Sequence, residues 1–244
     1  MIPRAPLQTP AVRKASRTLL APVTARRRLA DTPYALKFPA WQYLGLLLPG
    51  GMRYEPEVAA CLRQYIKPGA TVLDIGANIG LHSLLAAHLA GPTGRVHAFE
   101  PDPQSLRFLL ENVRINEMEN VTVWSVALSD REDVAEIHID LKTARATSMI
   151  EGHQAPLDEA PRQKLMVAAT TLDALSLGEV DFAKIDVEGA ELAVLSGARR
   201  LIEDSRPVVV IEVGAGHADL VHEYFHSLDY VLSEIQGNTV ALPG

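Results

Sequence analysis

The chain has 244 residues, of which 48% are hydrophobic, and a formal net charge of −7. This size suits one domain with an appendage, or at most two domains, and the single cysteine, Cys61, excludes an internal disulfide. No apolar run is long enough to cross a bilayer, and the basic N-terminus lacks the continuous apolar segment of a secretory signal. We therefore expect a cytoplasmic protein without a transmembrane segment.

The charge is distributed unevenly along the chain. Residues 1–37 hold eight Lys or Arg and one acid, whereas the remainder holds 15 basic and 29 acidic residues, a net charge of −14. We predict that residues 1–37 form a mobile basic arm, that residues 38–54 cap the substrate side, and that residues 55–244 form the main domain. The acidic body disfavours specific nucleic-acid binding, although the basic arm could contact anionic lipid, RNA or the body itself.

Strands and helices alternate from about residue 54, as in βαβ folds. The predicted strands cover residues 71–75, 95–99, 121–126, 182–185 and 207–213. The predicted helices cover residues 55–66, 81–89, 104–117, 190–202 and 217–227. Residues 230–235 and 239–242, split by a Gln-Gly-Asn turn, predict a closing antiparallel hairpin. The pattern predicts an α/β fold with a seven-stranded, mostly parallel sheet, helices on both faces and a C-terminal antiparallel hairpin.

Residues 129–170 interrupt this alternation. They combine a segment of alternating polarity, residues 135–139, with a polar stretch, residues 143–161. Long insertions near the ligand end of a sheet are where α/β enzymes commonly build a substrate pocket. We expect residues 129–170 and residues 30–54 to determine which substrate is bound.

The segment Val72 to Gly80 predicts a buried strand that turns tightly into a helix. Gly76 and Gly80 let the backbone approach a ligand without a Cβ in the way, and the turn brings backbone N–H groups beside that ligand. The spacing Gly76-x-x-x-Gly80 lacks the third glycine of a dinucleotide fingerprint. Asp74, at the strand end, suits a cationic ligand better than a pyrophosphate.

Acidic side chains follow several other predicted strands. Ligands of open α/β sheets lie outside the carboxyl ends of the strands, where Glu100 could accept both hydroxyls of a ribose. Asp186 and Glu212 end the fourth and fifth strands, and each such acid has a plain alternative role as a helix cap. So much negative charge repels itself unless a cation, a metal or hydroxyl donors are present, and Lys184 could pair with a neighbouring acid.

These residues carry a resemblance to a known family. From residue 55 to residue 213 the chain resembles the FkbM family of S-adenosylmethionine-dependent methyltransferases. The motifs that carry the resemblance are Asp74–Gly80, Phe99–Pro101, Ala127–Ser129, Thr171–Asp173, Lys184–Glu191 and Ser196–Ala198.

The resemblance implies S-adenosylmethionine as the cofactor. The turn from Asp74 to Gly80 would hold its methionine part, with Asp74 near the ammonium, Gly76 at a backbone contact and Asn78 in hydrogen-bonding reach. Glu100 would then hold the ribose hydroxyls, and Ala127 would offer a backbone N–H near the adenine. The implied acceptor is a hydroxyl of a sugar, a polysaccharide or a secondary metabolite.

Methyl transfer from a sulfonium mainly requires the donor and the acceptor to be aligned, because the leaving group is already activated. A hydroxyl acceptor must also lose its proton, and Asp186 and Glu188 are the candidates for the general base. A metal is the other way to lower the pKa of a hydroxyl, and Asp186 and Glu212 could supply oxygen ligands to Mg²⁺.

Three other functions are weighed against this one. An NAD-dependent oxidoreductase on a similar sheet is disfavoured by the missing third glycine and by the lack of a Tyr-x-x-x-Lys pair. A non-catalytic binding protein that kept the fold is disfavoured by the intact turn and strand-end acids. His222 and His226 match the H-E-x-x-H zinc signature, but the apolar pattern of that helix places both on its polar side, and no third ligand is evident.

Overall fold

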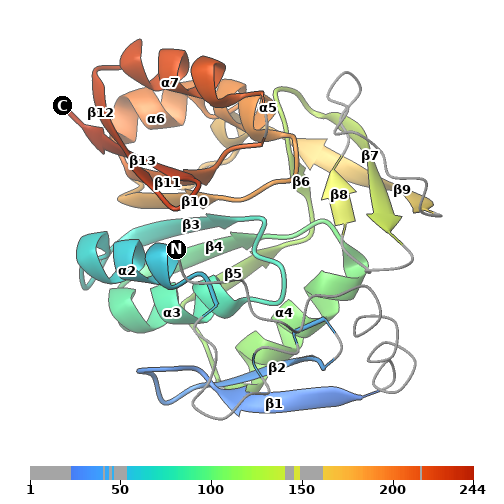
Figure 1. The fold of residues 1–244 in the computed structure, drawn as a ribbon. Coiled ribbons are helices and arrows are strands. Elements are labelled where there is room, and N and C mark those ends of the chain that lie inside the picture. The colour runs from blue at the N-terminus through green and yellow to red at the C-terminus, as the bar shows by residue number, and fades with distance from the viewer. Residues whose placement is uncertain are drawn as a thin grey trace.

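The computed structural model describes residues 23–40, 42–43, 46, 54–140, 146–148, 162–214 and 216–244. A seven-stranded sheet crosses the molecule, with its strands in the order β12-β13-β11-β10-β3-β4-β5 (Figure 1). Its strands are β3 Thr71–Ile75, β4 Arg95–Phe99, β5 Val121–Trp124, β10 Phe182–Ile185, β11 Val208–Glu212, β12 Tyr230–Ile235 and β13 Asn238–Pro243. Neighbouring strands are parallel except at β13, which pairs antiparallel with both β11 and β12. The predicted fold class and closing hairpin are confirmed.

Helices cover both faces of this sheet. One face carries α2 Pro56–Tyr65, α3 Leu81–Ala90 and α4 Pro103–Ile115, and the other carries α5 Glu191–Ser196, α6 Arg199–Ser205 and α7 Ala218–His226 (Figure 1). Side chains alternate along a strand, so Val72 packs with the α2 and α3 side while Leu73 and Ile75 pack with the α5 to α7 side. Two apolar cores result, one on each face.

The prediction of a single helix over residues 190–202 is wrong in one respect, because the chain forms two helices, α5 and α6, with a break between them. Gly197 lies at the break, where a Cβ would come within 1.9 Å of the carbonyl oxygen of Ser129. This close approach ties α5 to the start of the insertion, and a continuous run of larger side chains could not allow it.

The insertion builds a second sheet beside the first. Its four strands lie in the order β6-β9-β7-β8, and they are β6 Ala127–Leu128, β7 Asp133–Asp140, β8 Ala146–Ser148 and β9 Arg162–Thr170. The third predicted strand, residues 121–126, therefore stops at Trp124, after which the chain leaves the main sheet. The polar stretch of residues 143–161 lies outside the described residues except for β8.

The N-terminal part of the described chain is an antiparallel hairpin of β1 Thr24–Arg28 and β2 Ala35–Pro39, which packs against α4. The prediction of a mobile arm through residue 37 is therefore wrong from residue 24 onward, while residues 1–22 lie outside the described residues. The reason is that β2 buries Leu36 and Phe38 completely or almost completely in the core of the main domain.

A side chain on α4 also fixes the hairpin. The amide of Asn112 accepts a hydrogen bond from the backbone N–H of Lys37 at 2.7 Å and donates to the carbonyl oxygen of Lys37 at 2.9 Å. Asn116, one helical turn later, makes the same pair of bonds with Ala35. The side-chain amides of Asn112 and Asn116 therefore provide hydrogen-bond partners for the outer backbone N–H and C=O groups of β2, as a neighbouring strand would. Among the described residues, no helix is both long and apolar enough to cross a membrane.

Candidate functional site

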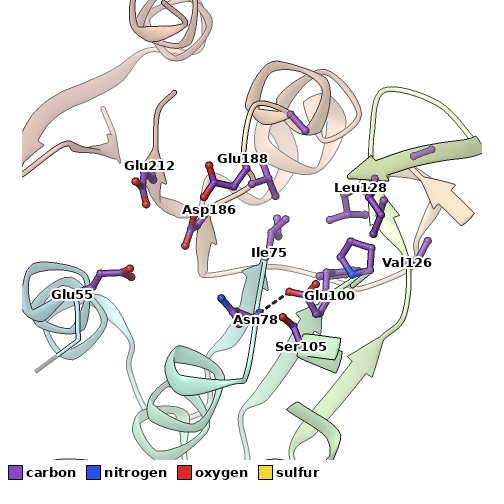
Figure 2. Close-up of a pocket in the computed structure, with 18 of the residues that line it drawn as sticks. Glu55, Ile75, Asn78, Glu100, Ser105, Val126, Leu128, Asp186, Glu188 and Glu212 are labelled. Carbon is purple, nitrogen blue, oxygen red and sulfur yellow. Dashed lines mark hydrogen bonds between the residues drawn. The ribbon is translucent and has the colours of Figure 1, made fainter. Parts of the chain in front are cut away.

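The carboxyl ends of the central strands open onto a cavity of about 190 Å³ (Figure 2). Open α/β sheets bind their ligands at this edge. Sites for small molecules commonly enclose about 300 to 1,000 Å³, so a ligand of nucleoside size would extend over the rim. The predicted site residues that line the cavity are Gly76, Asn78, Glu100, Ala127, Asp186, Glu188 and Glu212.

The turn between β3 and α3 requires its glycines for packing. Gly76 has a φ of 75°, and a Cβ there would lie 1.9 Å from the carbonyl oxygen of Asp186. Gly80 has a φ of 87°, and a Cβ there would lie 2.6 Å from the side chain of Leu109 on α4. The turn is therefore pressed against the end of β10 on one side and against α4 on the other.

The backbone N–H groups of the turn point largely into the protein. Those of Gly76 and Ala77 donate to the carbonyl oxygen of Phe99, and that of Asn78 donates to the Glu100 carboxylate at 2.7 Å. The expectation that the turn presents these N–H groups to a ligand is wrong for these three residues, because the end of β4 supplies their acceptors. The Asn78 side chain instead lines the cavity and accepts a hydrogen bond from the Tyr43 hydroxyl at 2.8 Å.

Glu100 is a buried carboxylate on the cavity wall. One of its oxygens accepts a hydrogen bond from the Asn78 N–H (Figure 2), and the other accepts one from the Asp102 N–H at 2.8 Å. Burial raises the pKa of Glu100 to about 7, against the lowering effect of these two hydrogen bonds. Each carboxylate oxygen has capacity for a further bond, so a pair of ligand hydroxyls could donate to Glu100 and favour its charged form.

An apolar wall continues from Glu100 toward the second sheet. It includes Phe99 at the end of β4, Ala127 and Leu128 of β6, and Ile137 of β7. The Trp124 ring stacks on Phe99 with centroids 5.7 Å apart, so Trp124 supports this wall. A flat aromatic base could lie against such a surface, which fits the predicted place for an adenine near Ala127.

Asp74 and Gly80 do not line the cavity. The buried Asp74 carboxylate accepts a hydrogen bond from the Ser83 hydroxyl at 2.5 Å and lies 3.5 Å from the Lys184 ammonium. The parallel register of β3 and β10 places Asp74 directly beside Lys184, which explains why the side chain faces its neighbour strand rather than a ligand. A direct contact of Asp74 with a cofactor is therefore not supported by its position.

Lys184 is a buried cation beneath the strand-end acids. Its ammonium lies 3.1 Å from the Asp186 carboxylate and donates to the carbonyl oxygen of Gly76 at 3.2 Å. Burial opposes its charge, but the carboxylates of Asp186, Asp74 and Glu55 raise the pKa of Lys184 above its ordinary range. The lysine thus supplies the positive charge that the accumulation of acids requires.

Three carboxylates meet at the end of the cavity opposite Glu100. Oxygen atoms of Glu55, Asp186 and Glu212 all lie within 4.8 Å of one another, and Glu188 lines the cavity beside them (Figure 2). Burial, with added repulsion from Asp186 and Glu188, raises the pKa of Glu212. The predicted acids Asp186, Glu188 and Glu212 are therefore brought together.

Glu55 is a site residue that the sequence analysis missed. It precedes Pro56 at the start of α2 with φ 44° and ψ 62°, a left-handed conformation that is uncommon outside glycine, and its side chain does not cap the helix. Burial raises the pKa of Glu55 to about 7. The nearby His82 ring, 3.7 Å away, has a pKa lowered to about 4 by burial, so it is neutral at pH 7 and does not neutralise Glu55.

The H-E-x-x-H helix does not form a metal centre in the described part of the chain. His222 contacts Glu234 at 3.1 Å and Thr239 at 3.4 Å across the C-terminal hairpin. The converging group of possible metal ligands found among the described residues is Glu55, Asp186 and Glu212, which lies elsewhere. The metallopeptidase alternative therefore has no support from the geometry.

Comparison with known proteins gives a family match over most of the sheet. The family model described as "Methyltransferase FkbM domain" matches residues 74–237. The crystal structure of a methyltransferase FkbM from Methylobacillus flagellatus KT superimposes with a TM-score of 0.52 at 20% identity, over 75% of this chain and 50% of that chain. At this identity the likeness concerns the fold.

Two relatives are similar in sequence over different spans. The Ribosomal protein L11 methyltransferase of Thermotoga maritima is 36% identical over 89 residues, which cover 33% of each chain. The Hexuronic acid methyltransferase AglP of Haloferax volcanii is 24% identical over 183 residues, covering 75% of this chain and 72% of the relative. This chain therefore spans only about a third of the first relative and half of the FkbM structure.

Proposed function

Because the chain belongs to the FkbM methyltransferase domain family, we propose that it transfers a methyl group from S-adenosylmethionine to a hydroxyl of a sugar-like acceptor. The observation that carries the proposal is that Glu100 and Asp186 lie at opposite ends of the same cavity, with the β3–α3 turn between them (Figure 2). One end is suited to a nucleoside and the other to a hydroxyl that loses a proton.

The cofactor end is supported by the chemistry of the residues present. The Glu100 carboxylate can accept hydrogen bonds from two adjacent hydroxyls, and the wall around Ala127 is apolar enough for a base. The Asn78 amide and the Gly76 backbone would flank the amino-acid part of the cofactor. Asp74 and Gly80 would contribute without touching the cofactor. Asp74 would hold Lys184 in place through their ion pair, and Gly80 would allow α4 to pack closely against the turn.

When bound, S-adenosylmethionine supplies a methyl group on a positively charged sulfur. The protein must then orient the acceptor oxygen and receive its proton. Asp186 suits this role because the Lys184 ammonium fixes its position at 3.1 Å. Glu55 and Glu188 face the same space, and the raised pKa of Glu55 lies near neutral pH, where a general base works best.

The nature of the acceptor follows from the carboxylates. Several carboxylate oxygens can each accept a bond from a different hydroxyl, as a sugar ring would offer. They would repel a phosphate-rich polymer, and the net charge of −7 acts in the same direction. The relative named as a hexuronic acid methyltransferase, aligned over 75% of this chain, supports a carbohydrate acceptor.

A divalent cation is the alternative use of Glu55, Asp186 and Glu212. Three oxygens within 4.8 Å could bind Mg²⁺, but the Lys184 ammonium already lies 3.1 Å from Asp186 and would repel a cation there. We therefore assign these groups to hydroxyl binding and proton acceptance. Turnover should be unchanged by EDTA under this assignment.

The test is methyl transfer from labelled S-adenosylmethionine to a panel of acceptors: hexose glycosides, hexuronate glycosides, RNA and a protein extract. We expect label on a sugar hydroxyl, and we expect Asp186→Asn to remove it while S-adenosylhomocysteine still binds. Label found only on RNA or protein would contradict the proposed acceptor. Turnover that requires Mg²⁺ would contradict the role given to the carboxylates.

A further inference from the structure

A second cavity of about 680 Å³ lies between the turn of the β1–β2 hairpin and the helices α2 and α3. Its size falls within the range of small-molecule sites. Its walls are formed largely by aliphatic side chains from three separate parts of the chain, namely Leu36, Leu46, Leu81 and Leu85. Each of these side chains is at least nine-tenths buried, so the cavity reaches down to the core.

The mouth of this cavity is positively charged. Arg27, Arg28 and Arg63 line it, against the single carboxylate of Asp31. Arg63 pairs with Asp31 at 3.2 Å and donates to the carbonyl oxygen of Ala59 at 3.1 Å, and Arg28 donates its Nε–H to the carbonyl oxygen of Thr32. A guanidinium has five N–H donors, so the contacts of Arg28 and Arg63 leave capacity for an anionic group. The positive mouth is notable in a chain whose net charge is −7.

Tyr54 connects the two cavities, because it lines both of them. The next residue along the chain, Glu55, lines the acceptor end of the first cavity. Leu81, the first residue of α3, lines the second cavity directly after the turn that borders the first. Tyr54 is therefore a wall shared by the second cavity and the acceptor end of the first.

We propose that the second cavity binds an anionic amphiphile, with its aliphatic chain against the leucines and its phosphate or carboxylate at the arginines. An aliphatic chain matches the walls because burying apolar surface is favourable, and an anion matches the guanidinium groups of Arg28 and Arg63. This inference rests on the proposed function in one respect: the amphiphile is the lipid part of the acceptor, whose sugar lies beyond Tyr54.

The test is calorimetric titration of the full chain with decyl phosphate below its critical micelle concentration. We expect saturable binding, with decanol and inorganic phosphate at least about tenfold weaker. Octyl phosphate should bind more weakly than decyl phosphate, since each buried methylene contributes a factor of up to about four. Equal affinity for decanol and decyl phosphate would overturn the role of the arginines, and no saturable binding would overturn the site.

A matched pair of variants locates the binding. Ala59, nearly buried on α2, lines the cavity, whereas its exposed neighbour Ala60 does not. Ala59→Leu should weaken decyl phosphate binding about tenfold, and Ala60→Leu should leave that binding unchanged. Equal effects of the two substitutions would overturn the assignment.

A second pair of variants tests the arginines. Arg63→Gln should weaken decyl phosphate binding, and the exposed Arg95→Gln should not. Binding of S-adenosylhomocysteine, measured in parallel, reports separately on the proposed function.

Discussion

The Lys184 ammonium lies 3.1 Å from the Asp186 carboxylate, at the point where β10 reaches the ligand edge of the sheet. This pair links the buried interior to the acidic end of the cavity. It gives the acidic cluster a buried positive charge, and it holds Asp186 in the place where the proposed acceptor hydroxyl would need it.

Removing the ammonium should destabilise the fold. Lys184→Met leaves Asp74 and Asp186 without their cation, and breaking a buried pair in this way costs about 3 to 5 kcal/mol of unfolding free energy. Urea unfolding at pH 7 measures the loss. Lys164→Met, which removes an exposed lysine paired with Glu136, is the control and should change little. A Lys184→Met protein as stable as the control would contradict the role given to this pair.

Gly76 should tolerate no side chain. Gly76→Ala drives a Cβ into the carbonyl oxygen of Asp186, in addition to the strain of its positive φ. Gly178 has a similar φ, 77° against 75°, but open space around it, so Gly178→Ala isolates the strain, about 1 kcal/mol. We expect Gly76→Ala to lose at least about 2 kcal/mol more in urea unfolding. Equal losses would mean that the turn and β10 are not in contact.

Glu55 should contribute to turnover more than to cofactor binding. Glu55→Gln removes a proton acceptor, which should lower kcat about 100-fold, while the dissociation constant of S-adenosylhomocysteine stays within about twofold. The acceptor identified by the labelled-methyl panel provides the assay. Glu57→Gln, on the first turn of the same helix, is the matched control. An unchanged kcat for Glu55→Gln would remove Glu55 from the reaction.

Much of this site could be predicted because the evidence is local. A strand followed by Gly76 and Gly80 dictates a turn, and parallel strands bring Asp186 and Glu212 to one edge whatever the rest of the chain does. Glu55 could not be placed in this way. It comes from a helix start far from Asp186 in sequence, and only tertiary packing brings them together. The hairpin was missed because its backbone is satisfied by Asn112 and Asn116 on a distant helix.

The stability of the protein should depend on pH through Glu100. Its pKa is about 7 in the fold against 4.5 for the unfolded chain, so the folded state binds more protons between these values. The contribution of Glu100 is therefore fully present below about pH 4.5 and is lost as pH rises through 7, on the order of 3 kcal/mol in total. Glu100→Gln should flatten this fall, measured by urea unfolding from pH 5 to pH 8.

The exposed Glu119 provides the comparison for that experiment. Glu119→Gln should keep the pH dependence of the wild-type protein. If the Glu100→Gln protein also kept the wild-type pH dependence, Glu100 would be ionised in the fold at acidic pH. Burial would then not raise the pKa of this residue.

Calorimetric titration of the purified chain with S-adenosylhomocysteine tests the central claim, that the cavity between Glu100 and Asp186 binds the cofactor. We predict saturable binding, no binding of NAD, and a loss of about 1 to 3 kcal/mol in binding free energy for Glu100→Ala. Absence of binding, or an affinity that Glu100→Ala leaves unchanged, would contradict the account.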